Sequence, residues 1–396
     1  MALKRKNKSL YIDQEAVAAL QMLKAGLLSP VTALMNKSEV LDVLRHSSYH
    51  GTTCPFPFIL TPAGKRNTQV LKSSQRGDTL DLICEGKLFA TLKVDEIFQI
   101  DPKERLRQIY GTSDKSHPGV KSTYQRIGNY AVCGEYTLKE PLPNLHKQTI
   151  IQAKERINAN SVTAIMMAAN PLHRAHERLI RQSLDSSNLV VVFLLKPHCK
   201  QDIAYDIRYD MVKYFADNYL PKNQVIIVPL EQNYIFAGIN EIIIDAILAK
   251  NYGCTQLLIG PNHAGLGMYY ESNSNKSIID SIKGIDIKIS IAREYVYCDT
   301  CKTLVSTNTC PHGHHHHISY HSDSILELLK LGIMPPAVLL RKEISALILS
   351  KMFPNRFKNL EKLYYDLLPA SGLIENHTEE EFYKALMKLY QTTSLT

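Results

Sequence analysis

The chain has 396 residues, of which 45% are apolar and 21% charged, so it can bury large cores and is excluded from the disordered and fibrous classes. The net charge of +8 favours anionic ligands, but the 46 basic residues are scattered, so a solvated surface is the simpler interpretation and no nucleic-acid partner is expected. No apolar run reaches a membrane-spanning length, and the basic N-terminus lacks the apolar stretch of a signal peptide. We therefore expect no membrane association and a cytoplasmic location.

The first part of the chain, residues 1–150, reads as a β-rich domain. A helical pattern at 14–24 is followed by short alternating segments, "TLDLICEG" and "KLFATLKVDEIFQI", that are separated by Gly and Pro. Alternation with a period of two is typical of strands that bury one face.

From about residue 160 to 295, apolar strand-like runs alternate with helical patterns. The expected strands are "VTAIMM", "LVVVFLL", "QVIIVPL", "QLLIG" and "DIKISI", and the expected helices cover 172–184, 206–218 and 239–251. Strands that are apolar on both faces and separated by helices predict a parallel, doubly wound sheet. Ligands bind such sheets at the carboxyl ends of the strands, where "NPLHRAH" and "GPNHAG" both stand, so we expect these two segments to face one pocket.

The turn after the first of these strands reads "AANPLHRAHE". His173 and His176 are three residues apart on the expected helix and lie near its N-terminus, where free N–H groups favour an anion. Two imidazoles at this place can donate to phosphate oxygens and stabilise charge on a phosphoryl group. Structural histidines and metal ligation are the alternatives. Asn170 and Pro171, which stand after a strand and in front of the histidines, favour nucleotidyl transfer.

The segment "CDTCKTLVSTNTCPHGHHHH" predicts a structural zinc site. Cys298, Cys301, Cys310 and His314 have a spacing that suits a closed tetrahedral Zn²⁺ site. The other histidines of the run compete for the fourth position: His312, His315, His316 and His317. A redox pair of Cys298 and Cys301 and a metal-storing His tract are the rival interpretations. After this segment, residues 321–396 read as a small helical region, so the expected division is 1–150, 151–320 and 321–396.

"NPLHRAHE" resembles the H-x-x-H motif of ATP sulfurylases, and "NYGCTQLLIGPNHAGLGMYY" resembles that family's second signature around G-R-D-H-A-G. Further matches are "GLLSPVTALM", "YGTSDKSHPGV", "KQDI" with Arg208, "FAG", and "LGIMPP" with "RKE". The resemblance implies a PUA-like N-terminal domain, a Rossmann-like nucleotidyltransferase domain and a small zinc-bearing helical region. It also implies ATP with Mg²⁺ as substrate, a small anionic acceptor and a homo-oligomer. The chain has no G-x-x-x-x-G-K-[ST] sequence, so no fused P-loop kinase is expected.

The resemblance assigns roles to individual residues of the two motifs. It makes Asn170, His173 and His176 the catalytic residues. It places the nucleotide against these three and against Pro171, Gly260, His263, Ala264 and Gly265. Lys196, Lys200, Arg174 and Arg208 are further cations that could reach a bound anion, or that could simply be solvated.

The chain departs from the family where the acceptor is expected. The family's first motif is Q-T-R-N-P-x-H-x-x-H, and Met167 and Ala169 replace the Gln and Arg that are associated with sulfate. Pro261 and Asn262 replace the Arg and Asp of the second motif, and Ile235 and Asn240 replace two more arginines. Each charge-assisted hydrogen bond contributes about 1.5–3 kcal/mol, so losing two weakens a sulfate site by roughly 3–6 kcal/mol. We therefore expect an acceptor pocket of Met167, Ala169 and Pro261 that is more apolar than the family's.

Three functions follow from these observations. The first is a sulfate adenylyltransferase-like enzyme that joins ATP and sulfate, or another oxyanion, into an adenylylated acceptor and releases pyrophosphate. The second is an adenylyltransferase for a non-sulfate acceptor. The third is a nucleotide-binding homologue without catalysis.

Overall fold

The computed structural model describes residues 7–141, 146–196, 203–231, 238, 240–261, 263, 274–368 and 376–390. These residues form two compact units. The first contains Met1–Met166, Leu195–His198 and Pro229–Ile291, and the second contains Met167–Leu194, Cys199–Val228 and Ala292–Thr396. Each unit is described by itself. Among the described helices, none is both long and apolar enough to cross a bilayer.

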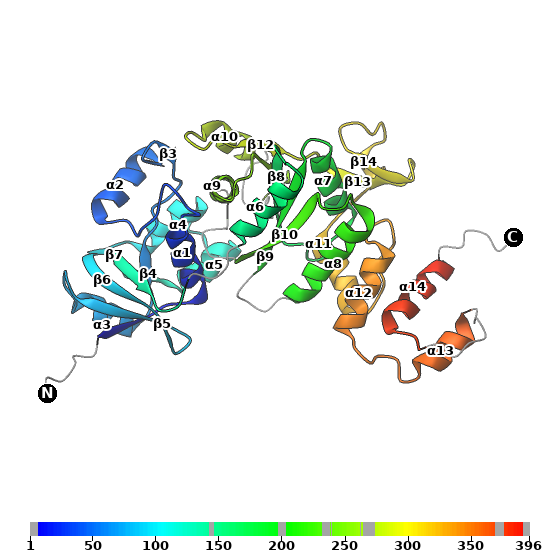
Figure 1. The fold of residues 1–396 in the computed structure, drawn as a ribbon, viewed down its shortest axis with the longest axis horizontal. Helices are drawn as coiled ribbons and strands as arrows, with labels where there is room; N and C mark the ends of the chain where they lie inside the picture. Colours follow the sequence, from blue (N-terminus) through cyan, green and yellow to red (C-terminus); the bar gives the residue numbers. More distant parts are fainter. Residues whose placement is uncertain are drawn as a thin grey trace. The chain divides into compact units, whose positions relative to one another are not determined.

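The N-terminal part of the first unit is β-rich, as its alternating sequence predicts (Figure 1). Its elements are β1 (Lys8–Tyr11), α1 (Gln14–Lys24), α2 (Lys37–His46), β2 (Ser48–Tyr49), β3 (Thr52–Thr53), β4 (Leu60–Pro62), α3 (Lys65–Lys72), β5 (Thr79–Cys84), β6 (Lys87–Gln99), α4 (Pro102–Tyr110), α5 (Pro118–Tyr124) and β7 (Ile127–Leu138). The main sheet has the strand order β1-β5-β6-β7-β4. Only the β1–β5 pair of this sheet is parallel, and β5 and β6 are joined by a short turn, as an antiparallel pair allows.

Local sequence explains where these helices begin. The Asp13 side chain accepts a hydrogen bond from Ala16 N at the start of α1, and Asn36 with Glu39 forms a capping box for α2. His117 caps α5, because its Nδ1 accepts a hydrogen bond from Val120 N at 3.3 Å. His117 is fully buried, and this capping hydrogen bond gives it a structural role at the start of α5.

A second sheet contains the strands expected from the alternating apolar runs. Its strands are β8 (Val162–Met167), β9 (Leu189–Lys196), β10 (Val225–Glu231), β11 (Gln256–Ile259) and β12 (Lys288–Ile291). Over the described residues the strand order is β10-β9-β8-β11-β12, and β11 pairs in parallel with both β8 and β12. The intervening helices are α6 (Lys147–Arg156), α7 (Arg174–Leu184), α8 (Tyr205–Tyr219), α9 (Glu241–Asn251) and α10 (Ser274–Ser281). The predicted parallel α/β architecture is confirmed.

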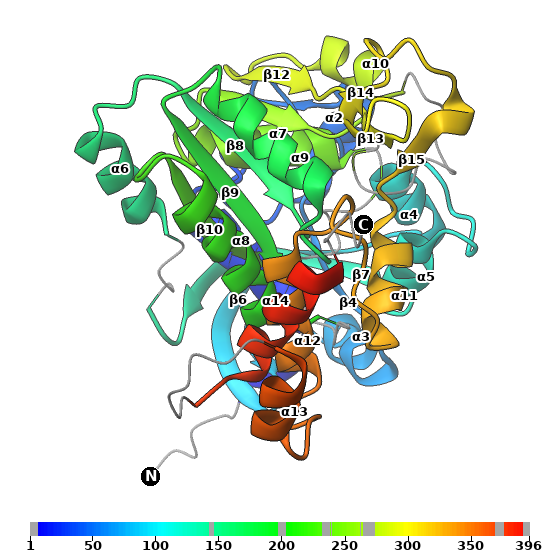
Figure 2. The ribbon, with the colours of Figure 1, turned by 90° about the vertical axis from the view of Figure 1, so that its right-hand side faces the viewer.

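The C-terminal part belongs to the second unit. It begins with a small antiparallel sheet, ordered β14-β13-β15, and continues as helices. The elements are β13 (Tyr295–Cys298), β14 (Thr303–Ser306), β15 (His317–Ser319), α11 (Ser322–Lys330), α12 (Lys342–Met352), α13 (Leu360–Leu367) and α14 (Glu379–Tyr390). Figure 2 shows α12 and α14 side by side, in orange and red. The expected helical region after the cysteines is therefore present.

Candidate functional site

The turn between β8 and α7 is built from residues with unusual backbone geometry. Ala169 has a φ of 48°, in the left-handed region that L-residues rarely adopt, and the Asn170–Pro171 peptide bond is cis. His173 is extended, with φ −100° and ψ 173°, and serves as the N-cap, so α7 begins at Arg174. The prediction that this helix starts at residue 172 was wrong, because the proline and the extended histidine delay the first helical residue.

His173 and His176 stack on one another at the start of α7. Their ring centroids are 3.7 Å apart, and His173 N lies 3.4 Å from His176 Nδ1, to which it donates. Burial lowers the pKa of His176 to about 4, while burial and then the neighbouring His176 lower the pKa of His173 well below its ordinary value. Both rings are therefore neutral near pH 7. Because His176 Nδ1 accepts a hydrogen bond, the proton of its neutral ring is on Nε2.

Two polar atoms at this turn are buried without a hydrogen-bond partner among the described residues. They are Asn170 Oδ1 and His173 Nδ1. Buried polar atoms are normally paired, and exceptions call for an explanation such as a binding function. The structure thus brings the three predicted catalytic residues together at one helix N-terminus and leaves part of their hydrogen-bonding capacity for a bound group.

A buried ion pair anchors α7. Glu177 is 4% exposed, and its two oxygens accept from Arg341 Nε at 3.0 Å and Arg341 Nη2 at 2.6 Å. Arg174 Nη1 donates to the same carboxylate at 3.2 Å, and the Arg341 guanidinium lies 3.7 Å from the centre of the Tyr219 ring. This bidentate geometry fixes the helix that carries the histidines. The sequence interpretation named neither Glu177 nor the role of Arg341, because the two residues are distant in the chain.

The expected acceptor residues of this turn are buried. Met167 is 4% and Ala169 1% exposed, whereas Ala168 between them is exposed. Arg208 from α8 is 1% exposed, and its Nη1 donates to the carbonyl oxygen of Ala168 at 2.6 Å. The sequence left open whether Arg208 is a solvated charge. Its burial against the turn excludes that interpretation and places a cation beside the predicted acceptor residues.

The second motif lies in the first unit, where Gly260, Pro261 and His263 follow β11. His263 Nε2 is 2.8 Å from Asp245 Oδ2 on the buried helix α9, and Glu241 lies one turn away on the same helix. Burial raises the pKa of Glu241 well above its ordinary range, with a further contribution from Asp245, and burial also raises the pKa of Asp245. The sequence interpretation did not include Asp245, which holds the His263 ring. Asn262, Ala264, Gly265, Ile235 and Lys200 lie outside the described residues.

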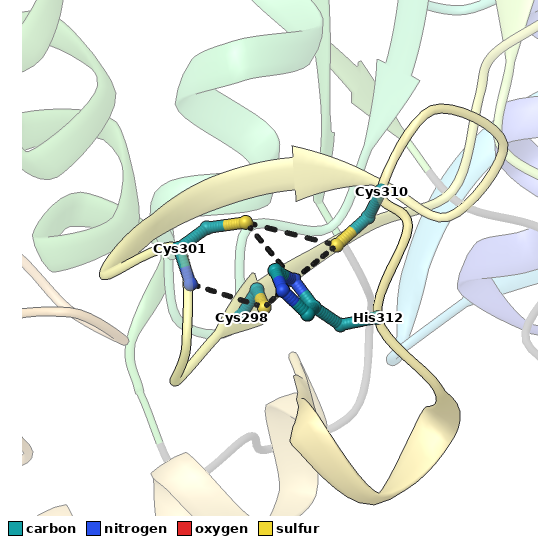
Figure 3. A group of neighbouring side chains, drawn as sticks. All are labelled: Cys298, Cys301, Cys310 and His312. Carbon is teal, nitrogen blue, oxygen red and sulfur yellow. Dashed lines mark hydrogen bonds between the residues drawn. The ribbon is translucent and has the colours of Figure 1, made fainter.

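The cysteine cluster forms a compact group with a histidine (Figure 3). His312 Nδ1 lies 3.4 Å from the sulfur of Cys298, 3.3 Å from that of Cys301 and 3.6 Å from that of Cys310. The sulfurs of Cys301 and Cys310 are 3.9 Å apart. In a tetrahedral Zn²⁺ site, bond lengths of about 2.3 Å to sulfur and about 2.0 Å to nitrogen imply separations of about 3.8 Å between sulfurs and about 3.5 Å from sulfur to nitrogen. The group fits zinc.

His314, which the spacing predicted as the fourth ligand, is not part of this group. His312 stands two residues after Cys310 and turns its ring toward the sulfurs, whereas His314 begins a 3₁₀ turn and packs edge-on against the His317 ring at 5.8 Å. His316 is also engaged elsewhere, because its Nδ1 lies 2.7 Å from Asp299 Oδ1. The group that could hold zinc is therefore Cys298, Cys301, Cys310 and His312.

Comparison with known proteins decides the family. The pattern of the ATP-sulfurylase family matches residues 144–351, and that of a PUA-like domain matches residues 1–140. The chain belongs to the ATP-sulfurylase family. The resemblance that the two motifs indicate is therefore confirmed, as is the expected order of a PUA-like domain followed by a nucleotidyltransferase domain with a parallel sheet.

Sulfate adenylyltransferases of other organisms align with most of this chain. A sulfate adenylyltransferase of Chloroflexus aurantiacus is 29% identical over 350 residues, which is 86% of this chain and 90% of that protein. The sulfate adenylyltransferase of Staphylothermus marinus is also 29% identical, over 353 residues, and that of Halothermothrix orenii is 27% identical over 355 residues. Membership of this family supports adenylyltransferase activity as the enzyme class.

A solved structure shares the fold. The structure described as a hexameric APS kinase from Thiobacillus denitrificans aligns with a TM-score of 0.62 and 17% identity over 89% of this chain. The alignment covers 64% of that longer chain, so the likeness shows a common fold.

Proposed function

We propose that this protein transfers the adenylyl group of MgATP to a small oxyanion and releases pyrophosphate, with sulfate as the first candidate acceptor. The observation that carries the proposal is the stacked, neutral pair of His173 and His176 at the start of α7, next to the unsatisfied Asn170 Oδ1. This arrangement suits the phosphates of a nucleotide. Family membership supports the reaction class.

In the proposed reaction an oxygen of the acceptor attacks the α-phosphorus of ATP in line. The new bond joins that oxygen to the α-phosphorus, and the bond from this phosphorus to the oxygen that bridges to the β-phosphorus breaks. Pyrophosphate leaves with the Mg²⁺ that entered with ATP. The neutral His173 and His176 rings donate N–H groups to the phosphate oxygens and stabilise the charge that accumulates on them, and the helix N-terminus adds to this stabilisation.

The other motif would contact the nucleotide, and zinc would have a structural role. We propose that Gly260, Pro261 and His263 take part in nucleotide binding, with Asp245 holding the His263 ring. The four zinc ligands fill a tetrahedral shell, so zinc would cross-link the loop between β13 and β15 and leave no coordination position open. We also propose a homo-oligomer, in keeping with the described hexamer of the structural neighbour, and light scattering of the purified protein tests it.

A second candidate is an adenylyltransferase for a larger or less charged acceptor. It is favoured by Met167 and Ala169, which supply no donor for an oxyanion. Under the sulfate hypothesis Arg208, buried against Ala168, would be the cation that compensates for the missing family arginine. An Arg208→Gln variant would then lose affinity for sulfate more than affinity for ATP.

The test is the reverse reaction, in which purified protein, adenosine 5′-phosphosulfate, pyrophosphate and Mg²⁺ are assayed for ATP. We expect ATP formation by the wild type, at least a hundredfold less by His173→Ala, and unchanged formation by His46→Ala, which alters an exposed histidine on α2. Absence of ATP from a folded protein that binds nucleotide would exclude sulfate. A pyrophosphate-release screen with carboxylates and organic phosphates would then separate another acceptor from a binding role without catalysis.

A further inference from the structure

A cavity of about 820 Å³ lies in the second unit between α7 and the hairpin of β13 and β14, and we call it the α7-hairpin cavity. Figure 1 shows the helix and the two strands next to one another. Its volume is that of an ordinary small-molecule site. The residues that line it do not include Asn170, His173 or His176, the proposed catalytic residues.

Basic side chains dominate this cavity. Arg174, Arg178 and Arg181 follow one face of α7, and Arg293 and Lys302 come from the segments around the hairpin. The one carboxylate in the lining is Glu177, whose oxygens are already engaged by Arg341 and Arg174. Arg174 is thus paired with Glu177, whereas the other four cations bring positive charge to the cavity and form no salt bridge with a described residue. Like charges three and four residues apart destabilise a helix slightly, so a bound anion would also relieve repulsion within α7.

The arginines divide into two that are held in place and two that are not. Arg174 Nε donates to the carbonyl oxygen of Ala337 at 3.0 Å, and Arg181 Nη2 donates to that of Tyr219 at 2.6 Å. These bonds fix both guanidinium groups and leave further N–H groups of each for a ligand. Arg178 and Arg293 are exposed and form no ion pair with any described residue. Guanidinium groups bind phosphate groups in a bidentate way, which makes this set suited to phosphates.

Tyrosines supply flat surfaces in the same cavity. Tyr295 lies under the Arg178 guanidinium at 5.7 Å, and its hydroxyl donates to Gln182 Oε1 at 3.2 Å. Tyr297, on the same face of β13, has no aromatic or cationic partner for its ring among the described residues. An aromatic face beside arginines can stack a planar ring.

We propose that the α7-hairpin cavity is a second ligand site that binds a phosphorylated organic anion with a planar ring, such as a nucleoside polyphosphate. The arginines and Lys302 hold its phosphates, and Tyr297 stacks on its ring. The site is separate from the one at His173, and the two are joined by Tyr320. The Tyr320 ring lines the cavity and stacks on His173 with centroids 5.4 Å apart, so an occupant can affect the catalytic histidine.

The test counts binding sites with ADP as the probe, by isothermal titration calorimetry on the zinc-loaded full chain at low ionic strength. We expect two sites in the wild type and one in Arg178→Glu/Arg293→Glu, whose cavity affinity falls at least a hundredfold. The double variant Arg45→Glu/Arg76→Glu makes the same charge change at exposed positions of the N-terminal part and is expected to keep two sites. His173→Ala is expected to keep the cavity site.

Each result bears on the proposal. Equal site numbers and affinities in the wild type and in Arg178→Glu/Arg293→Glu overturn it. Loss of all ADP binding in that variant, with an unchanged circular dichroism spectrum, also overturns it, because the cavity would then be part of the His173 site. If the double variant does not fold, Lys302→Glu and Tyr297→Ala are each expected to weaken the second site alone. The test is independent of the reverse reaction, since ADP can bind the cavity whether or not sulfate is the acceptor.

Discussion

The histidine pair at the start of α7 makes the free energy of unfolding depend on pH. The pKa of His176 falls from an ordinary 6.5 to about 4 in the folded protein, so between these values the unfolded chain binds more protons. The neutral ring contributes fully to stability above pH 6.5, and this contribution is lost as the pH falls toward 4. We expect the free energy of unfolding to drop by on the order of 3 kcal/mol over this range from His176 alone.

Urea unfolding of the zinc-loaded protein at pH values between 4.5 and 7.5 measures this dependence. His176→Gln cannot titrate, so its stability should fall less steeply than that of the wild type. Other effects of low pH on stability, including release of zinc, act on both proteins. They therefore cancel when the free energies of unfolding of the wild type and the variant are subtracted at each pH. Parallel pH profiles for the two proteins would contradict the interpretation of a buried neutral ring.

The zinc ligand set gives a second prediction at single residues. His312→Ala removes the nitrogen that faces three sulfurs and should weaken Zn²⁺ binding at least tenfold, whereas His314→Ala should leave it unchanged. Competition with a chromogenic zinc chelator measures both variants. The opposite order of effects would restore the ligand that the spacing alone predicts.

Residue types and their spacing were enough to place the two histidines, Asn170 and Pro171 at one turn, because these residues are close together in sequence. They could not find partners that only the fold brings near. Asp245 is far from His263 along the chain, and Arg341 is far from Glu177. The histidine that joins the three cysteines was left open between His314 and four competitors, His312 among them, for a different reason. Several histidines in one short loop have the same chemistry, and only the backbone path after Cys310 decides which of them turns toward the sulfurs.

At the scale of the elements, the position of α7 depends on the ion pair that Glu177 forms with Arg341 and Arg174. Glu177→Gln removes the charge that two arginines share and leaves Arg341 largely buried without a counterion. Breaking a buried ion pair in this way costs about 3 kcal/mol or more. We expect a loss of that size in the free energy of unfolding, together with reduced turnover, because the helix carries both histidines. Glu327→Gln, on the exposed face of α11, is the matched control, and an equally small loss in both variants would show that the pair does not anchor the helix.

Elements were predicted well where their periodicity is strong and less well at their ends. The apolar run at β9 is buried along almost its whole length, and α9 is buried on all sides, so both patterns could be read without knowing their neighbours. The starts of α7 and α9 were each placed two residues early. Backbone geometry at the N-cap decides these boundaries, and the pattern of apolar residues does not contain it.

At the scale of the whole molecule, two asparagines tie α9 to the N-terminal part of the first unit. Asn240 Nδ2 donates to the carbonyl oxygens of Gln108 and Ile109 at 2.9 and 3.0 Å, and Asn251 Nδ2 donates to those of Leu27 and Ser29 at 2.8 and 3.0 Å. Asn240 stands where the family has an arginine, and it serves as a link between segments of the fold. From the sequence, position 240 was interpreted only as the loss of a family arginine, and no structural contact was predicted for Asn240.

Each asparagine should contribute measurably to global stability. Asn240→Ala or Asn251→Ala leaves two partly buried carbonyl groups without a donor, and we expect a loss of about 1–3 kcal/mol for each. The two sites are at opposite ends of α9, so the losses should add in the double variant. Thermal and urea unfolding of the single and double variants test both statements. A double variant no less stable than the single ones would mean that the N-terminal part and α9 unfold independently.

These two links bind only main-chain oxygens on the N-terminal side, and every amino acid presents the same carbonyl group. Mutation of Leu27, Ser29, Gln108 or Ile109 to another residue leaves the acceptor in place as long as the backbone keeps its path. The linkage therefore constrains the backbone path of the N-terminal part and sets no requirement of its own on the side chains at these four positions. The requirement for a particular side chain falls on Asn240 and Asn251, whose amides have no equivalent among other residue types except the longer glutamine.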